Sequence, residues 1–197
     1  TKFNNKYSFV FIDRDDNVDS LLTKVKPLLK SLKDFTIAAE KKGYFSKIRP
    51  GKYKIKRSMG NNNIVNVLRS ERLTTKVTFN NQERLENLAG RISQQIEADS
   101  IELLNAFKDE QFLKLNGFSS TTALAMYLPN TYNLFWDVTV EDFRKRMLEY
   151  YNLFWNQERI QKANALKLNP IQVYILASIV QKESLRSEEQ NKIAGVY

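Results

Sequence analysis

The most informative segment of this chain is residues 169–183, which read Asn-Pro-Ile-Gln-Val-Tyr-Ile-Leu-Ala-Ser-Ile-Val-Gln-Lys-Glu. Asn169, followed by Pro and by Gln at the third helical position, is typical of a helix start. Residues 173–180 are apolar on almost every side, which predicts a buried helix. Glu183 comes four residues after Ile179 and shares its face, so we expect its carboxylate where the protein interior meets water.

Glu183 has two interpretations. Partial burial would favour the neutral acid and raise the pKa of its carboxyl group into the range useful for proton donation. The alternative is structural, because a carboxylate at this place can pair with a neighbouring Lys or cap the next helix. The spacing of the residues leaves both open.

The composition excludes several classes of enzyme. The 197 residues include 31 Lys and Arg against 22 Asp and Glu, a net charge of +9, and there is no Cys and no His. A disulfide scaffold, a thiol nucleophile, a Cys- or His-bound zinc and a histidine base are therefore excluded. Acid–base chemistry would fall to a carboxylate or an amine. The 42% hydrophobic content is that of a folded protein.

The charge is unevenly divided along the chain. Residues 1–76 hold 18 Lys and Arg against 7 Asp and Glu (net +11), whereas residues 77–197 hold 13 against 15 (net −2). This shift predicts two domains, residues 1–75 and 76–197. The basic run 41–57 has no acid, and it contains Lys41, Lys42, Lys47, Arg49, Lys52, Lys54, Lys56 and Arg57.

Hydrophobic periodicity and turn residues predict an α+β fold, with a small mixed module followed by a mainly helical part. Two capping patterns support helix starts, one at Asn80 with Glu83 and one at Ser187 with Gln190. The expected strands are 7–12, 52–55 and 76–79. The expected helices are 18–29, 35–42, 64–68, 85–96, 101–107, 109–115, 139–154, 170–183 and one after Ser187.

Three segments carry a resemblance to a known family. Residues 175–184 read Ile-Leu-Ala-Ser-Ile-Val-Gln-Lys-Glu-Ser and are followed by Ile-Ala-Gly-Val-Tyr at 193–197. Residues 127–132 read Tyr-Leu-Pro-Asn-Thr-Tyr, and residues 48–53 read Ile-Arg-Pro-Gly-Lys-Tyr. These segments, and their order along the chain, resemble the motifs of the endolytic murein transglycosylases, the YceG-like family. The C-terminal block is the specific one, and the Pro-Gly-x-Tyr turn alone would be weak.

The resemblance implies a LysM-like subdomain in residues 1–75 and the N-terminal part of a catalytic domain in residues 76–197. It also implies a lytic reaction, in which the β-1,4 bond between N-acetylmuramic acid and N-acetylglucosamine is broken inside a glycan strand and a 1,6-anhydro end forms. One carboxylate suffices as acid and then base, and the resemblance places this role on Glu183. No metal or other cofactor is implied.

The sequence departs from the family motif at two places. The first Glu of Ile-Val-Glu-Lys-Glu is Gln181 here, which identifies the chain as a Gln variant of the family. Gln181 can still hydrogen-bond a sugar or be an ordinary polar residue. Where the family often has Glu-Gly, this chain has Leu124-Ala125, so a second acidic group is not expected there.

Other candidate ligand contacts also have structural alternatives. By analogy, Asn130, Thr131 and Tyr132 would line the glycan cleft, or they form a turn after Pro129. Aromatic rings on the expected long helix would stack on sugars or, more in keeping with their spacing, pack in the core. These rings are Trp136, Tyr150, Tyr151 and Trp155.

The expected partners follow from the family. They are peptidoglycan glycan strands, peptidoglycan synthases and the inner membrane, reached through an N-terminal single-pass anchor absent from these residues, with the domain in the periplasm. The basic run 41–57 would meet an anionic wall or lipid surface or be a plain solvated face; no nucleic-acid partner is expected, because no matching motif accompanies it.

The chain stops at Tyr197, where the family continues, so we expect part of the cleft to be missing and activity to be low. The alternative function is a non-catalytic module that binds peptidoglycan or another polyanion.

Overall fold

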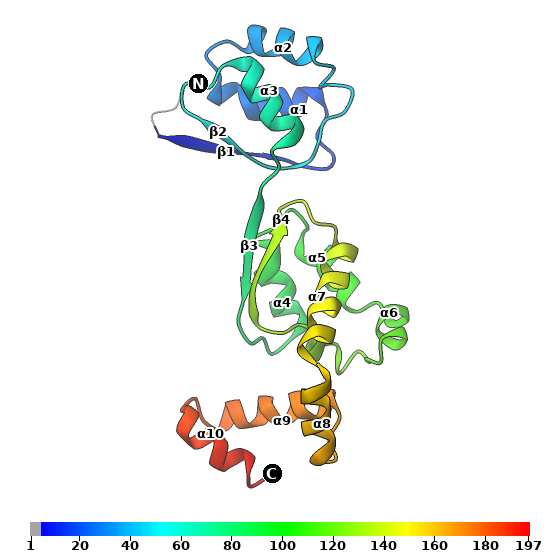
Figure 1. The fold of residues 1–197 in the computed structure, drawn as a ribbon. Helices are drawn as coiled ribbons and strands as arrows, with labels where there is room; N and C mark the ends of the chain where they lie inside the picture. The colour runs from blue at the N-terminus through cyan, green and yellow to red at the C-terminus, as the bar shows by residue number, and fades with distance from the viewer. Residues whose placement is uncertain (1–4) are drawn as a thin grey trace. The chain divides into compact units, whose positions relative to one another are not determined.

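The computed structural model describes residues 5–197 and has an α+β fold, as expected (Figure 1). The chain forms two compact units. Unit 1 comprises residues 1–79, 89–100 and 130–139, and unit 2 comprises residues 80–88, 101–129 and 140–197. Within the described residues, no helix combines the length and the hydrophobicity that crossing a membrane requires.

The elements of unit 1 begin with a β-α-α-β order. They are β1 (Tyr7–Ile12), α1 (Val18–Val25), the short 3-10 helix Lys26–Leu28, α2 (Leu32–Lys41), β2 (Gly51–Lys56), α3 (Asn61–Ser70), β3 (Thr74–Phe79) and β4 (Asn130–Phe135). α4 (Leu85–Ser93) is shared between the two units. Unit 2 contains α5 (Ser100–Phe107), α6 (Glu110–Leu115), the 3-10 helix Ala123–Met126, α7 (Val140–Phe154), α8 (Gln157–Ala165), α9 (Pro170–Glu183) and α10 (Ser187–Ala194).

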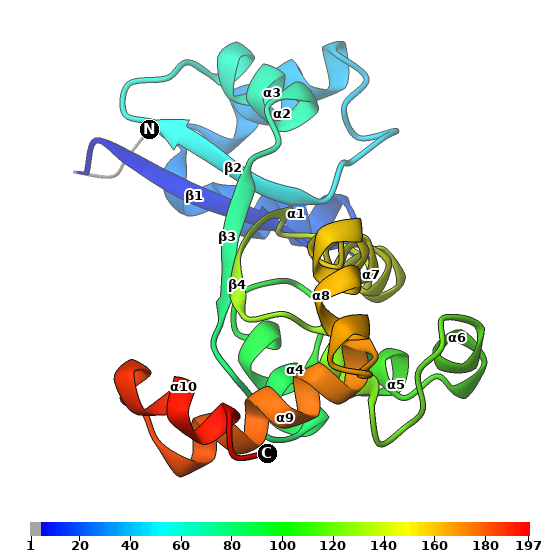
Figure 2. The ribbon, with the colours of Figure 1, turned by 60° about the horizontal axis from the view of Figure 1, so that its bottom comes forward.

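Residues 7–70 form a module with its own core. β1 and β2 pair antiparallel, and α1, α2 and α3 cover one face of the pair (Figures 1 and 2). Alternation along the strands explains this arrangement, because Val10 and Ile12 are buried while their neighbours Phe9 and Phe11 face outward. The helices supply apolar stripes to the same cluster, including Phe35, which is fully buried. The expected strands and helices of this module are confirmed, and its LysM-like character remains a prediction.

Gly51 opens β2 in a backbone conformation that other residues rarely adopt, with φ of +137°. A Cβ atom at this position would lie 2.7 Å from the side chain of Arg72. The Arg72 guanidinium donates to Asp137 Oδ2 at 2.8 Å and lies 3.6 Å from the centre of the Phe135 ring. Asp137 itself is only 7% exposed. The glycine therefore makes room for an ion pair of unit 1.

β4 was not expected from the sequence. The turn suggested for residues 130–132 is wrong, because these residues are extended and pair antiparallel with β3, with Val77 opposite Tyr132. The Tyr132 ring packs against Phe79 with a centroid distance of 5.5 Å. A single strand of six residues with polar positions at 130, 131 and 133 resembles a loop until its partner strand is known.

In unit 2, Arg144 of α7 joins three consecutive parts of the chain. Its guanidinium donates to the Ala106 carbonyl at 2.6 Å and to Asp109 Oδ2 at 2.9 Å, and it lies 3.8 Å from the centre of the Phe112 ring. Asp109 also accepts from the Phe112 amide as the cap of α6. The capping hydrogen bond and the guanidinium both lower the pKa of the Asp109 carboxyl group. α5 and α6 are thus held to α7 by a cation that is only 8% exposed.

Three expectations about the helices are wrong. α4 begins at Leu85, so Asn80 is too early to cap it. Ser187 lies inside α10 and does not cap it. The third concerns burial of α9: only Val180 is buried, and Ile175 and Ile179 are 46% and 38% exposed. The helix contacts α8, α10 and the 3-10 helix Ala123–Met126, and these neighbours cover only part of its apolar circumference. The capping box at Asn169 is confirmed, with both hydrogen bonds at 2.9 Å.

Candidate functional site

A cleft with both polar and apolar walls runs along the C-terminal half of α9 within unit 2. Its volume is about 590 Å³. Three segments far apart in the sequence form it: the loop between β3 and α4, the segment from the 3-10 helix to Pro129, and α9 with the residues just after it. The lining residues are Asn81, Gln82, Glu83, Leu124, Leu128, Pro129, Tyr174, Ala177, Ser178, Gln181, Lys182 and Leu185.

Gln181 is the predicted site residue that lines this cleft. Its Oε1 atom accepts a hydrogen bond from Asn81 Nδ2, which connects α9 to the β3–α4 loop. A second connection is the ion pair between Lys182 and Glu83. Hydrogen bonding to the Lys182 ammonium lowers the pKa of the Glu83 carboxyl group, so Glu83 is ionised at neutral pH and is a poor proton donor.

Glu183 is the last residue of α9 and follows directly on Gln181 and Lys182. Its expected partial burial is wrong, because the residue is exposed in this structure. Within residues 5–197 its carboxylate has no ion-pair partner, and it does not cap α10, so neither structural alternative is realised. Glu183 itself is not among the residues that line the cleft, although Gln181 and Lys182 before it and Leu185 after it are.

The turn after Glu183 is held by polar contacts. Ser184 Oγ donates to Glu189 Oε2 at 2.6 Å and accepts from the Arg186 amide at 3.1 Å. The Gln190 side chain donates to the Ser184 carbonyl at 2.9 Å. These bonds fix α10 to the end of α9, and the two helices pack on each other. They define the direction in which the chain leaves Glu183.

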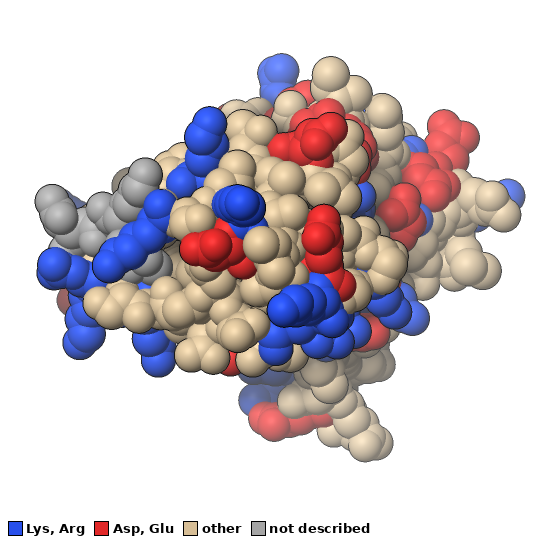
Figure 3. Space-filling view, turned by 90° about the horizontal axis from the view of Figure 1, so that it is seen from above, with Lys and Arg blue, Asp and Glu red and all other residues tan. Residues whose placement is uncertain are grey.

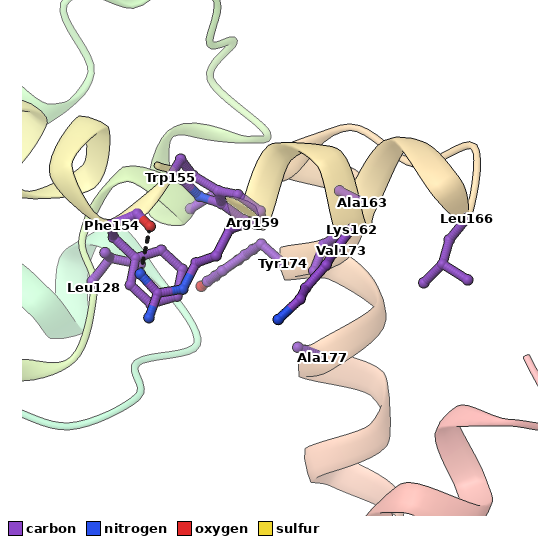
Figure 4. A pocket seen from close by; sticks show the side chains of 11 residues that line it. Leu128, Phe154, Trp155, Arg159, Lys162, Ala163, Leu166, Val173, Tyr174 and Ala177 are labelled. Atoms are coloured by element: carbon purple, nitrogen blue, oxygen red, sulfur yellow. Dashed lines mark hydrogen bonds between the residues drawn. The ribbon is translucent and has the colours of Figure 1, made fainter. Parts of the chain in front are cut away.

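An apolar groove of about 360 Å³ lies along another part of α9 (Figure 4). Trp155, just after α7, and Tyr174 from α9 face it, and burial raises the pKa of the Tyr174 hydroxyl. Arg159 lies over the Phe154 ring at 4.2 Å and donates to the Phe154 carbonyl at 2.7 Å, as Figure 4 shows. The groove and the cleft share Leu128, Tyr174 and Ala177 in their walls.

The aromatic residues considered for sugar stacking divide between core and surface. Tyr151 is 8% exposed and packs against Phe118 at 5.2 Å, as the core interpretation predicts. Trp155 lines the apolar groove. Trp136 belongs to unit 1, where it contacts Phe11 at 5.0 Å, and it is not on the long helix.

The other predicted ligand contacts, residues 130–132, belong to unit 1. Asn130 and Thr131 are exposed, and Thr131 Oγ1 forms a hydrogen bond of 2.8 Å with Thr78 Oγ1. Tyr132 is 3% exposed and offers little surface to a ligand. The segment just before them, Leu128 and Pro129, is the part of this motif that reaches the cleft of unit 2.

Sequence reasoning missed the contribution of Asn81 and Gln82 to the cleft. The polar run 80–84, between a strand and a helix, was interpreted as a cap for α4. Because α4 starts later, these amides are left on a loop, where side chains are available for binding. A run of five polar residues is longer than a helix cap requires. This length was the feature of the sequence that could have indicated a polar loop available for binding.

Comparison with known proteins gives two findings. The YceG-like family matches residues 10–197. A similar solved structure is the 2.6 Å crystal structure of a yceG-like protein from Listeria monocytogenes, with a TM-score of 0.52 and 16% sequence identity. The alignment covers 92% of this chain and 66% of that one, so this chain spans just under two thirds of its solved relative. No curated protein matches the chain.

Proposed function

Because the chain belongs to the YceG-like family, we propose that it acts in a lytic transglycosylase that cuts peptidoglycan glycan strands. The bond broken is the β-1,4 link between N-acetylmuramic acid and N-acetylglucosamine, and the product carries a 1,6-anhydro-muramyl end. The observation that supports the proposal is that Glu183 ends α9 as an exposed carboxylate directly after Gln181 and Lys182, two residues that line the cleft.

The proposed reaction needs one group that gives and then takes a proton. Glu183 donates its proton to the glycosidic oxygen as the bond from that oxygen to C1 of the muramyl residue breaks. The C6 hydroxyl of the same sugar then forms a bond to C1, and its proton passes to the Glu183 carboxylate. No water is consumed and the enzyme regains its starting state. Two-carboxylate hydrolases differ, since their second carboxylate serves as nucleophile or activates water.

The cleft supports this assignment of roles. Glu83 is the carboxylate that lines the cleft, and its ion pair with Lys182 suits it poorly for proton donation. Side-chain amides at Asn81, Gln82 and Gln181 offer both donors and acceptors, which matches the N-acetyl and hydroxyl groups of a glycan. Gln181 is thus a proposed binding residue, and Asn81 positions it through their hydrogen bond.

Partners and location follow as further parts of the proposal. Glycan strands are the substrate, synthases that polymerise glycan are partners, and the chain works on the periplasmic side of an inner membrane to which it is anchored. Asn130, Thr131 and Tyr132 remain predicted glycan contacts. For Tyr132 this would require its buried ring to be uncovered.

The test is product analysis on purified sacculi, with the longest natural polypeptide that contains these residues. Incubation in ¹⁸O-labelled water followed by mass spectrometry should show anhydro-muropeptides without the label. Labelled reducing ends would show hydrolysis and contradict the lytic mechanism. Binding to sacculi without any release would favour the non-catalytic alternative.

A further inference from the structure

The outward face of the β1–β2 pair has an unusual composition. Tyr7, Phe9 and Phe11 alternate along β1 and are 41%, 39% and 39% exposed. The antiparallel register sets them opposite Lys56, Lys54 and Lys52, so three rings and three ammonium groups share one face. We call these six residues the ring–lysine face.

Cations and rings on this face are in contact. Lys54 Nζ lies 4.0 Å from the centre of the Tyr7 ring, and Lys52 Nζ lies 4.5 Å from that of Phe9. The Tyr7 and Phe9 rings meet edge to face with a centroid distance of 5.3 Å. These contacts order the side chains, and each ammonium covers one face of an aromatic ring.

The charge of this face is of one sign. Neither strand contains Asp or Glu. The carboxylate that shares a hollow with Lys54 and Lys56 is that of Glu71. The opposite side of the module, seen from the helices, shows acidic and basic side chains next to each other (Figure 3). The two strands give their outward face three lysines and no carboxylate, which makes it complementary to an anionic partner.

We propose that the ring–lysine face rests on an anionic phospholipid bilayer, separately from the chemistry at α9. The lysine ammonium groups meet lipid phosphates, and the exposed rings of Tyr7 and Phe9 enter the headgroup region, where the amphipathic Tyr7 ring is favoured. Phe11, at the other end of the face, packs against Trp136. A two-stranded face with alternating side chains is suited to a surface that is itself extended in two dimensions. It needs no cavity.

The ring contacts favour a bilayer over a ligand that stacks. A sugar or a nucleobase that bound to Tyr7 or Phe9 would compete with the lysine ammonium for the covered ring face. A lipid surface leaves both cation–π contacts in place. It therefore uses the ordered arrangement as it stands, whereas a stacking ligand would break part of it.

The test is co-sedimentation of the 197-residue chain with vesicles of phosphatidylcholine, with and without phosphatidylglycerol. Binding should require phosphatidylglycerol and should fall as salt rises. The triple substitution Lys52→Gln, Lys54→Gln and Lys56→Gln should weaken the partition coefficient about a hundredfold, since each basic side chain at an anionic bilayer contributes roughly a factor of five. Circular dichroism checks that each variant is folded.

A matched control removes the same charge from the helix side: Lys30→Gln, Lys33→Gln and Lys41→Gln. These exposed lysines lie in or next to α2, so this variant should lose much less binding. The substitutions Tyr7→Ser and Phe9→Ser keep the charge and should still weaken binding. Equal losses in the two lysine variants, or no vesicle binding, would overturn the proposal. Lysine-dependent binding to sacculi without vesicle binding would also overturn it and would make glycan the partner. None of these outcomes depends on Glu183 or on catalysis.

Discussion

The module of residues 7–70 and the helix α9 are both rich in apolar residues, yet they differ in what covers those residues. In the module, strands and helices supply both sides of one core, and residues such as Ile12, Leu21 and Phe35 are fully buried. In α9, Ile175 and Ile179 remain 46% and 38% exposed. An apolar pattern thus predicts that a helix forms and seeks contacts, but burial depends on partners that the pattern does not identify.

The largest expected effect concerns the end of α9. Glu183→Gln should lower the release of anhydro-muropeptides by at least about 10²–10⁴-fold, because the amide cannot give up and retake a proton. Mass spectrometry of digested sacculi measures the release. Stability should hardly change, since the residue is exposed.

The matched control for Glu183 is Glu188→Gln, in the first turn of α10. It removes the same charge from an exposed position five residues away. Activity should be retained, with a stability change of about 0.3–1 kcal/mol from the helix dipole. Full activity of the Glu183→Gln protein, or loss of activity in the folded control, would refute the assignment.

The comparison of burial can be tested directly by truncating one side chain in each region. Phe35→Ala in the module should lower the free energy of unfolding by about 3–5 kcal/mol, because the ring is fully buried. Ile175→Ala on α9 should cost less than about 1 kcal/mol. Urea denaturation followed by circular dichroism measures both, and a larger loss at Ile175 would show that α9 is covered in solution.

A smaller effect is expected from the helix caps. Asn169→Ala removes the side-chain oxygen that accepts from the Gln172 amide, while the bond from the Asn169 amide to Gln172 Oε1 can remain, and it should cost about 0.5–2 kcal/mol. Ser187→Ala should stay within about 0.5 kcal/mol, because Ser187 lies inside α10 and its side chain accepts no capping hydrogen bond. Hydrogen exchange of amides in the first turn of each helix distinguishes the two. Comparable losses would mean that the Ser187 side chain does cap α10.

The smallest effect concerns the ion pair of the cleft. Lys182 lowers the pKa of the Glu83 carboxyl group below its ordinary value of 4.5, so the pair contributes at neutral pH and is lost as the pH falls through the lowered folded pKa. An NMR titration of the Glu83 side chain should show this lowered midpoint. Lys182→Met should return the midpoint towards 4.5. Both side chains are 70% exposed, so the change in stability should be slight. An unchanged midpoint in the variant would contradict the contact.

The sequence predicted those elements whose signals are local. The hydrophobic period and the turn residues predict β1, β2 and α1, and the capping box follows from Asn169, Pro170 and Gln172, which lie within four positions. The sequence did not predict β4, because its extended conformation depends on pairing with β3, some 50 residues earlier in the chain. Its polar residues carry no strand signal of their own.

The candidate site shows the same division. The segment around Gln181 and Glu183 could be found from its motif. The partners Asn81 and Gln82 could not, because they reach the cleft through the end of β3 and the delayed start of α4. Exposure of Glu183 was also missed, since the cover of α9 is a tertiary property.

Gly51 limits which amino-acid substitutions the chain can accept during evolution. Any side chain there meets Arg72 and must also adopt an unfavourable φ. Shortening Arg72 would make room, but it would remove the cation that faces the largely buried carboxylate of Asp137. The three positions are therefore epistatic: a substitution at one becomes tolerable only after changes at the others. The absence of a side chain at residue 51 thus constrains the mutational paths open to two residues far along the chain.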